Sequence, residues 1–429
     1  TISHHAYKNT ETLKKSNSMM RLSIATILAS LGPGLSFAFT INDARISHNH
    51  YFTKKSSLQV LADDETIMLP SDADQKPLGI PGTAKLDKPW TDLGFEFTPT
   101  KSNLRITYKN GEWGEPELCE DPHVSLHMGA TALHYGQACF EGLKAFCHED
   151  NSVYVFRPDE NAKRLQSSCE RIMMPVLPHD LFLKAVNEVV RDNIEYVPPY
   201  GSGGALYLRP LLFGSGPRIG LQPADEYTFI LMVIPVGDYY KGGLAAPVDG
   251  IIVKDYDRAA PRGVGNVKVA GNYAADLLPN MISKKKGFPI SLYLDAKTQS
   301  IVEEFSTSNF VGIDNKNKKY VTPKSRSVLP SITNKSLMTI AKDEGMSVET
   351  RDIFVEELET FDEVMACGTA VVVTPVGSMT SFGENEEEKK YVFGDNNDIG
   401  PTTKRMYDRV RAIQYGEEED KFGWNFKIN

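Results

Sequence analysis

The sequence has few cysteines and no excess of positive charge. Its 429 residues include five cysteines, an odd number, and no CxxC pair. A disulfide framework or a cysteine zinc site is therefore not expected, and a reducing compartment fits this composition. The nine histidines form no HExxH motif, so no zinc-protease site and no metal site are expected. The net charge of -9 without a basic stripe argues against nucleic acid as a partner.

A long hydrophobic run occurs in one place, near the N-terminus. MMRLSIATILASLGPGLSFAFT (19–40) has a basic Arg21, an apolar stretch of signal-peptide length and a small-x-small end. Pro33 and Gly34 interrupt the stretch before it reaches the roughly 20 residues that a membrane helix needs. We therefore interpret this run as a targeting signal and expect no membrane contact in the mature form.

The segment after this run has the composition of a transit peptide. Residues 39–59 contain one acid, Asp43, with several basic and hydroxyl residues. The order of signal and transit-like parts resembles the two-part plastid presequence of algae with secondary plastids. We predict that residues 1–84 are a presequence and a disordered linker, with the plastid as destination and the mitochondrion as the alternative.

Strand-like and helix-like segments alternate through the rest of the chain. Strands are predicted at 204–214 and 226–236, and the flexible GDYYKGG (237–243) follows them. We predict an α/β (α+β) fold with a small N-terminal domain over 85–236, a linker over 237–243 and a large C-terminal domain over 244–429.

Helix signals are clearest in five segments. We predict helices over 159–174 with Asp159 as N-cap, over 181–197 and over 270–287, and further helices over 331–345 with Ser331 or Thr333 near the cap and from Pro401 to Gly416.

One lysine has neighbours that cannot pair with its charge. Lys268 lies in GNVKVAGNY (265–273), among small and amide-bearing residues. The ordinary interpretation is a lysine on a solvated loop. The alternative is a reactive amine, which needs an aldehyde partner to form a Schiff base, and pyridoxal 5'-phosphate (PLP) is the common one.

PLP also needs a carboxylate for its pyridine nitrogen and a hydrogen bond to its ring oxygen. Tyr273 lies five residues after Lys268, so its phenol is a candidate for the ring oxygen. Glu303 and Glu304 follow an apolar pair, and a buried carboxylate there needs a cation such as a protonated pyridine. Two exposed acids in a turn are the alternative.

Three features are candidates for binding the phosphate. LPSITNKS (329–336) offers free N–H groups at a helix start, where the helix dipole favours an anion. CGTAV (367–371) offers a Gly-Thr turn between strands. Arg164 offers a fork-shaped cationic donor, with a solvated helix arginine as the alternative.

Eight stretches in this order resemble the PLP-dependent aminotransferases of fold type IV. The resemblance covers roughly residues 90–425 and is closest to the branched-chain amino acid aminotransferases of the bacterial and plastid branch. The stretches are HYGQACFEGLKAF (134–146), FRPDENAKRL (156–165), LYLRPLLFGSG (206–216), PVGDYY (235–240), GVGNVKVAGNY (263–273), EEFSTSNF (303–310), LPSITNKS (329–336) and CGTAVVVTPVG (367–377).

The resemblance implies a role for each matching cofactor residue. Lys268 is implied as the Schiff-base lysine and as the acid and base that moves the substrate proton. Glu304 is implied as the partner of the pyridine nitrogen, because the family glutamate lies five residues before the asparagine, here Asn309. Tyr273 is implied to bond the ring oxygen. The implied phosphate ligands are Arg164, Ile332, Thr333 and Thr369.

The resemblance also implies the substrate side of the site. The residues implied to line it from the small domain are Tyr135, Phe140, Tyr207 and Arg209. Arg209 is the implied partner of the second carboxylate of glutamate or 2-oxoglutarate. Tyr135 and the Thr369 and Ala370 backbone are implied to take the substrate carboxylate. Tyr239 in the linker is implied to cover the pocket.

The implied reaction is a ping-pong transamination between L-leucine, L-isoleucine or L-valine and 2-oxoglutarate. It gives branched 2-oxo acids and L-glutamate, in biosynthesis or degradation, and the family implies a homodimer. Two other activities on this fold stay open, a D-amino acid aminotransferase and an aminodeoxychorismate lyase. A PLP-binding scaffold without catalysis is a third alternative.

Four residues depart from the family pattern. Phe305 replaces a smaller residue, Phe310-Val311 replaces an aliphatic-Phe pair, and Ser331 replaces a glycine. These changes bear on ring packing and pocket size. The CxxC switch of animal mitochondrial members is absent, so thiol regulation of that kind is not expected.

Overall fold

The computed structural model describes residues 77–238, 243–244, 246–383, 387–395 and 398–429 of the chain. All of them belong to one of two units into which the chain divides, Asp74–Asn429. Among the described helices, none combines the length and the apolar character that crossing a bilayer requires.

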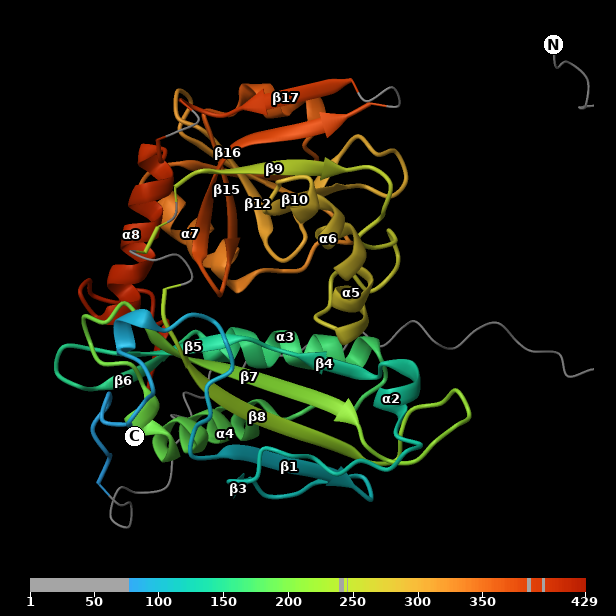
Figure 1. Ribbon diagram of the computed structural model, residues 1–429, viewed down its shortest axis with the longest axis vertical. Helices are drawn as coiled ribbons and strands as arrows, with labels where there is room; N and C mark the ends of the chain where they lie inside the picture. The colour runs from blue at the N-terminus through green and yellow to red at the C-terminus, as the bar shows by residue number, and fades with distance from the viewer. Residues whose placement is uncertain (1–76, 239–242, 245, 384–386, 396–397) are drawn as a thin grey trace, which may run out of the picture. The chain divides into compact units, whose positions relative to one another are not determined.

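The first half of the described chain, with one strand from the C-terminal end, builds a nine-stranded sheet around the long β7–β8 hairpin (Figure 1). The sheet runs in the order β18-β6-β5-β7-β8-β1-β2, and β3 pairs with β1 and β4 with β7. Its strands are β1 (Asn103–Lys109), β2 (Glu112–Trp113), β3 (Glu117–Cys119), β4 (Ala138–Phe140), β5 (Leu143–Cys147), β6 (Val153–Phe156), β7 (Ala205–Gly214), β8 (Tyr227–Val236) and β18 (Asn425–Lys427).

Helices α3 (Pro158–Arg171) and α4 (His179–Asp192) bury their apolar faces against this sheet. In α4 the buried Phe182, Val186 and Val190 recur at helical spacing, which confirms the pattern seen in the sequence. The shorter elements of this half are η2 (Trp90–Asp92), α2 (Thr131–Tyr135) and η3 (Ile194–Tyr196).

The second half builds another nine-stranded sheet, part of which closes on itself. Its order is β11-β10-β9-β16-β15-β12-β13-β14, with β17 on β16, and β11 also pairs with β12. The ring closes where Glu304 faces Asn309. The strands are β9 (Val248–Val253), β10 (Ile290–Leu294), β11 (Val302–Phe305), β12 (Asn309–Asp314), β13 (Lys319–Pro323), β14 (Ser347–Arg351), β15 (Glu363–Gly368), β16 (Val372–Phe382) and β17 (Glu388–Val392).

Two apolar clusters lie on opposite faces of this second sheet. Phe305 and Phe310 stack in one of them, so the two bulky residues that depart from the family pattern fill the core together. Helices α7 (Ile332–Asp343) and α8 (Pro401–Tyr415) cover the other face. The remaining elements are α5 (Ala270–Ala275), α6 (Leu277–Lys285) and η4 (Val355–Thr360).

Several predicted elements are confirmed. Helix α8 begins at Pro401 and ends before Gly416, which has the left-handed φ of 74° common at helix ends. Helix α7 is capped by Ser331, whose hydroxyl accepts a hydrogen bond from the Asn334 N–H at 3.1 Å. The predicted interruption near Gly368 separates β15 from β16.

The predicted start of α3 is wrong. The helix begins at Pro158, so Asp159 lies in its first turn instead of capping it. Arg157 holds the cap position with φ 52°, and the fixed φ of proline suits the first helical residue.

Two helices predicted as continuous are interrupted by buried polar side chains. The helix predicted over 181–197 stops after Asp192, because the Asn193 amide donates to the Ser102 and Val189 carbonyls. The helix predicted over 270–287 breaks at Asp276, whose carboxylate accepts from the Tyr293 and Ser306 hydroxyls. In both cases a tertiary contact overrides helix propensity.

Candidate active site

The backbone of Lys268 is fixed by the first sheet and by α3. Its N–H donates to Ser168 Oγ at 3.0 Å, and its carbonyl accepts from the Phe140 N–H at 3.0 Å. Val269 forms an isolated bridge with Cys139 of β4. Lys268 is therefore held by Ser168 and Phe140, which lie in the first half of the chain.

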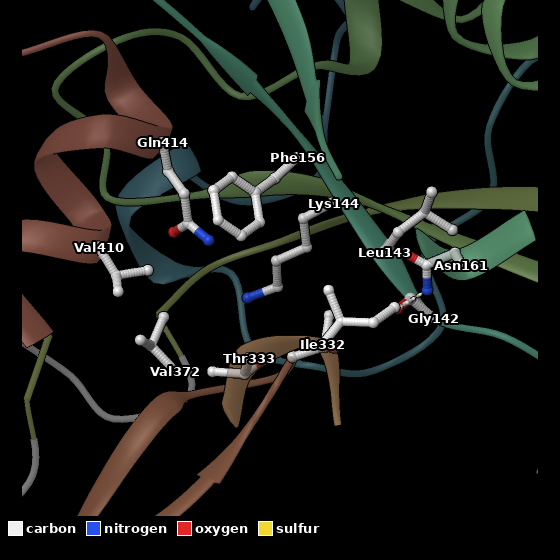
Figure 2. A pocket seen from close by; sticks show the side chains of 11 residues that line it. Gly142, Leu143, Lys144, Phe156, Asn161, Ile332, Thr333, Val372, Val410 and Gln414 are labelled. Carbon is white, nitrogen blue, oxygen red and sulfur yellow. Dashed lines mark hydrogen bonds between the residues drawn. The ribbon is translucent and has the colours of Figure 1, made fainter. Parts of the chain in front are cut away.

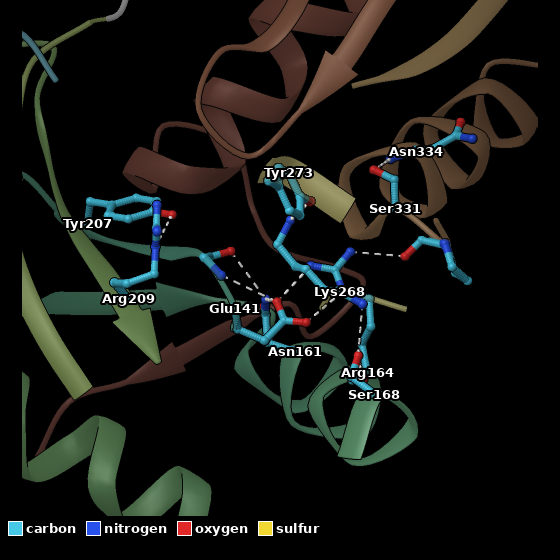
Figure 3. Close-up of polar contacts among 12 residues, drawn as sticks. Glu141, Asn161, Arg164, Ser168, Tyr207, Arg209, Lys268, Tyr273, Ser331 and Asn334 are labelled. Atoms are coloured by element: carbon cyan, nitrogen blue, oxygen red, sulfur yellow. Dashed lines mark hydrogen bonds and ion pairs between the residues drawn. The ribbon is translucent and has the colours of Figure 1, made fainter. Parts of the chain in front are cut away.

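The Lys268 side chain ends between the rings of Phe140 and Tyr273, and Figure 3 shows it beside Tyr273. Its Nζ donates to the Tyr273 hydroxyl at 2.8 Å and lies 4.8 Å from the centre of the Phe140 ring. The residue as a whole is half-buried, but protein surrounds the ammonium, and this burial, aided by the nearby Arg164, lowers its pKa to about 8. Lys268 is thus not the solvated loop lysine of the ordinary interpretation.

Tyr273 stays protonated over a wide pH range. Burial, followed by the negative charge of Glu304, raises the pKa of its phenol to about 12. Its ring packs edge-on against Phe140, with ring centres 4.9 Å apart. The phenol is therefore a stable hydrogen-bond donor beside the lysine amine.

Glu304 is a buried carboxylate on β11, where the second sheet closes on itself through the pairing of β11 with β12. It accepts hydrogen bonds from the Leu329 N–H at 3.0 Å and from Asn309 Nδ2 at 3.1 Å. Arg258 Nη2 lies 2.6 Å from Glu304 Oε1. Burial raises the pKa of Glu304 to about 7, although Arg258 opposes this shift.

This environment answers the question that the sequence left open at Glu303 and Glu304. Both side chains are buried, so neither is the exposed acid of the alternative. Glu303 accepts from Ser325 Oγ at 2.7 Å, whereas Glu304 faces the lysine closely enough to affect its pKa. Glu304 Oε2 accepts one hydrogen bond, from Asn309, so it retains capacity for a further donor.

Arg164 is buried in a two-pronged ion pair and is not a solvated helix arginine. Its Nε and Nη2 donate to the two oxygens of Glu141 at 2.8 and 2.7 Å. Its Nη1 donates to the Pro330 carbonyl at 3.0 Å, at the start of α7. These three bonds leave two of the five guanidinium N–H groups available for an anion.

The remaining phosphate candidates converge on one small cavity (Figure 2). Ile332, Thr333 and Thr369 line this cavity of about 20 Å³ together with Gly142 and Lys144. The start of α7 and the turn after β15 therefore lie side by side, as a shared phosphate site requires.

Three of the predicted substrate residues form one cluster. Arg209 Nε donates to the Tyr207 hydroxyl at 3.1 Å, and the guanidinium lies 4.9 Å from the centre of the Phe140 ring. Phe140 thereby connects this cluster to Lys268, which lies over the same ring. In Figure 3, Tyr207 and Arg209 lie together to the left of Glu141.

One predicted substrate residue, Tyr135, is not brought into this cluster. Tyr135 is 43% exposed, and its hydroxyl donates to the Ile219 carbonyl. It lines another cavity, of about 460 Å³, with Arg171 and Gly271. Tyr239 lies outside the described residues.

Three functional candidates were missed because their partners are distant in the sequence. They are Glu141, which holds Arg164, Arg258, which holds Glu304, and Lys144, whose Nζ donates to the Ala370 carbonyl at 2.8 Å. Glu141 and Lys144 lie in the stretch FEGLK, but nothing local indicates what they contact. In the described part of the chain no cluster of His, Cys, Asp or Glu is arranged to hold a metal ion.

Comparison with known proteins gives consistent matches. The amino-transferase class IV family model matches residues 138–379. A branched-chain-amino-acid aminotransferase of Haemophilus influenzae is 46% identical over 348 residues, 80% of this chain and 99% of the relative. The chloroplastic branched-chain-amino-acid aminotransferase 3 of Arabidopsis thaliana is 40% identical over 355 residues, 81% of this chain and 82% of the relative.

A solved structure matches the fold of the described chain. It is the branched-chain amino acid aminotransferase of Escherichia coli, with a TM-score of 0.63 and 27% identity. The match covers 77% of this chain and 100% of the other. The chain belongs to the class IV aminotransferase family, which confirms the family and the mixed α/β fold of type IV expected from the sequence.

Proposed function

We propose that this protein is a PLP-dependent branched-chain-amino-acid transaminase. It exchanges the amino group between L-leucine, L-isoleucine or L-valine and 2-oxoglutarate. The relatives from Haemophilus influenzae and Arabidopsis thaliana, which carry this name, support the proposal. The observation that carries it is the meeting of Lys268, Tyr273, Glu304 and Arg164 around one Phe140 ring and one helix start.

The residues fit PLP by the chemistry of their donors. Lys268 Nζ offers the amine for the aldehyde carbon, and Tyr273 offers a phenol for the ring oxygen. The second oxygen of Glu304 is available to hold a protonated pyridine nitrogen. Arg164, Ile332, Thr333 and Thr369 would hold the phosphate. When bound, PLP supplies an electron-accepting ring.

Lys268 is proposed to move the substrate proton. Because burial lowers its pKa to about 8, a substantial fraction of the amine is neutral near neutral pH. A neutral Nζ can take the proton from the substrate Cα and hold it for return, as a general base of matched pKa does. Tyr273, with a pKa near 12, stays protonated and donates through both steps.

Substrate choice is proposed to depend on the cluster of Phe140, Tyr207 and Arg209 on the first sheet. Phe140 offers an apolar wall for a branched side chain, and Arg209 offers a cation for the second carboxylate of glutamate or 2-oxoglutarate. The backbone N–H groups of Thr369 and Ala370 are proposed to take the α-carboxylate. Tyr135, for which the family implied the same role, lines the separate cavity described above. An apolar wall separates side chains that differ by one methylene only weakly, so all three branched substrates should react.

A homodimer is proposed as the working form. Large apolar side chains are exposed on α6 and around α2, and a second copy would remove them from water. They are Met128, Leu133, Ile219, Leu221, Leu277, Leu278 and Met281. Light scattering should give twice the chain mass. A monomer that is active at all concentrations would contradict the proposal.

The domain limits and the destination also remain proposals. We propose the domains at 85–236 and 244–429 with the linker at 237–243, which limited proteolysis should cut first. We propose that the segment predicted over 1–84 directs the protein to the plastid, which the chloroplastic name of the Arabidopsis relative supports. The end of this segment is not a disordered linker, because Leu78 packs against the first core and the Ala84 N–H donates to the Glu195 carbonyl at 3.0 Å. A fluorescent fusion of this segment that accumulates in mitochondria would contradict that destination.

A substrate panel tests the proposed activity. The purified holoenzyme is assayed with L-leucine, L-isoleucine, L-valine, L-glutamate and D-alanine, each with 2-oxo acid acceptors. We expect turnover of the three branched L-amino acids with 2-oxoglutarate. Turnover of D-alanine in place of the L-amino acids would show a D-amino acid aminotransferase instead.

A further inference from the structure

A second buried lysine, Lys144, lies near the proposed site and has no part in the roles assigned above. It stands in the middle of β5, every residue of which is buried, and it is itself 6% exposed. Its side chain leaves the first sheet and donates from Nζ to the Ala370 carbonyl, 226 residues later, at 2.8 Å. It thereby connects the first sheet to the turn between β15 and β16. Figure 2 shows its side chain among Thr333, Val372 and Gln414.

The surroundings of Lys144 disfavour a charged amine, because burial removes the amine from water. Burial, and then the positive charge of Arg411, lowers its pKa to about 7, while Asp238 acts in the opposite direction. Among the described residues no carboxylate lies within ion-pair distance of its Nζ. A methionine would fill the same space without this desolvation cost, so the hydrogen bond to Ala370 needs a functional reason.

The turn that Lys144 contacts is strained. Val372 has φ 64°, a conformation that a β-branched residue rarely adopts. Lys144 gives the one side-chain hydrogen bond that any described residue donates to a carbonyl of Thr369, Ala370 or Val371. Such a backbone conformation persists where surrounding contacts over-determine it.

We propose that Lys144 is a positioning residue for substrate binding. By holding the Ala370 carbonyl, it fixes the Thr369–Ala370 turn so that the N–H groups of the turn face the substrate α-carboxylate. This inference rests on the proposed role of Thr369 and Ala370. Because a neutral amine and an ammonium both donate hydrogen bonds, the contact persists on either side of neutral pH.

The position of Lys144 distinguishes it from a second reactive amine. It lines the small cavity with Thr333, Thr369 and Gln414, and its Nζ donates to the Ala370 carbonyl of the turn. Lys268 instead lies over Phe140 and Tyr273. Lys144 acts on the substrate through the backbone that it holds.

The test compares K144M, which keeps length and loses the donor, with K144R, which keeps a donor. The probe is 4-methylpentanoate, which has the carboxylate and branched end of leucine but cannot react. Its binding to the PLP-loaded protein is measured by calorimetry, together with KM and kcat for L-leucine. We expect K144M to raise the Kd of the probe and the KM about tenfold, which corresponds to roughly 1.4 kcal/mol. The kcat should fall less than threefold, and K144R should restore most of the affinity.

Gln414→Met is the matched control, because Gln414 lines the same cavity and no hydrogen bond of the described residues joins its side chain to the turn. It should change the Kd of the probe less than twofold. A folded K144M with unchanged probe affinity would overturn the proposal, and so would a K144R as weak as K144M. If K144M does not fold, K144Q, which is too short to reach Ala370, is measured with the same outcomes.

The wild-type protein separates the two proposals. If it transaminates L-leucine but K144M binds the probe normally, only the role of Lys144 fails. If it has no activity on any branched L-amino acid, the proposed function fails first.

Discussion

The acid–base properties of the site come from burial more than from charge pairing. Lys268, Glu304 and Tyr273 all shift toward their neutral forms, each with burial as the largest cause. An amine with a pKa near 8 is a better base at neutral pH than an ordinary lysine. Glu304, at about 7, needs a cation to stay ionised, and Arg258 supplies part of that need in the protein alone.

The pKa of Lys268 predicts how cofactor uptake depends on pH. A lowered lysine pKa means that the neutral, nucleophilic amine predominates above about pH 8. The rate at which cofactor-free protein binds PLP covalently should rise with pH and level off above that value. Absorbance of the mixed protein and PLP measures it. K268A should show no covalent uptake at any pH, and a rate that falls between pH 7 and 8 would contradict the assignment.

The Arg258–Glu304 pair predicts a stability effect that depends on pH. Arg258→Met leaves a buried carboxylate without its cation, which should cost about 3–5 kcal/mol of unfolding free energy at pH 8. At pH 5 Glu304, with its raised pKa of about 7, is protonated, so the loss should be smaller there. Urea unfolding of the cofactor-free protein measures both values.

Arg262→Met is the control for this comparison, since Arg262 is exposed and should change stability by less than about 0.5 kcal/mol. An R258M protein as stable as the wild type at pH 8 would show that the ion pair contributes nothing.

At the scale of elements, the cap of α7 connects stability to the phosphate site. The Ser331 hydroxyl accepts the Asn334 N–H in the first turn of the helix. Ser331→Ala removes this acceptor and should cost about 1 kcal/mol, whereas Ser331→Gly should cost only a few tenths. Denaturant unfolding of the two variants measures the difference. Equal losses would show that the cap does not stabilise the helix.

Local sequence patterns predicted where helices end, but the break within a predicted helix depends on contacts with residues distant in the sequence. Pro401, Gly416 and Ser331 mark helix ends because their own backbone and side-chain chemistry acts within one turn. The break at Asp276 depends on Tyr293 and Ser306, which no local pattern reveals.

The candidate site divides in the same way. The resemblance to the family selected Lys268, Tyr273, Glu304 and Arg164. In the structure Lys268 bonds Tyr273, and Glu304 and Arg164 bond Leu329 and Pro330 just before α7. The groups that hold them, Glu141 and Arg258, could not be found, because ion pairs over tens of residues depend on the folded sheets. For the same reason the exposed position of Tyr135 was not foreseen.

At the scale of the whole molecule, the cysteines should be largely inert in the folded state. Cys119 is partly exposed, and the other four are buried. Burial raises the pKa of Cys147 and brings that of Cys367 to about 12, and Cys139 is raised by its contact with Cys169. Native protein should react quickly with about one equivalent of a disulfide reagent such as DTNB, and with all five after unfolding.

Cys119→Ser identifies the reactive thiol and should remove the fast phase. Rapid modification of two or more thiols in active wild-type protein would contradict this assignment.

Lys268 lies between the two sheets, since β4 and α3 fix its backbone and Glu304 of the second sheet is close enough to influence its pKa. The central claim is that this lysine carries the amino-group exchange. It is tested most directly by adding L-leucine, without an acceptor, to the PLP-loaded protein and following the visible spectrum and the 2-oxo acid formed. We predict loss of the visible band, one 4-methyl-2-oxopentanoate per site, and recovery on adding 2-oxoglutarate, with none of these in K268A. An unchanged spectrum with L-leucine, or an equal response of K268A, would contradict the account.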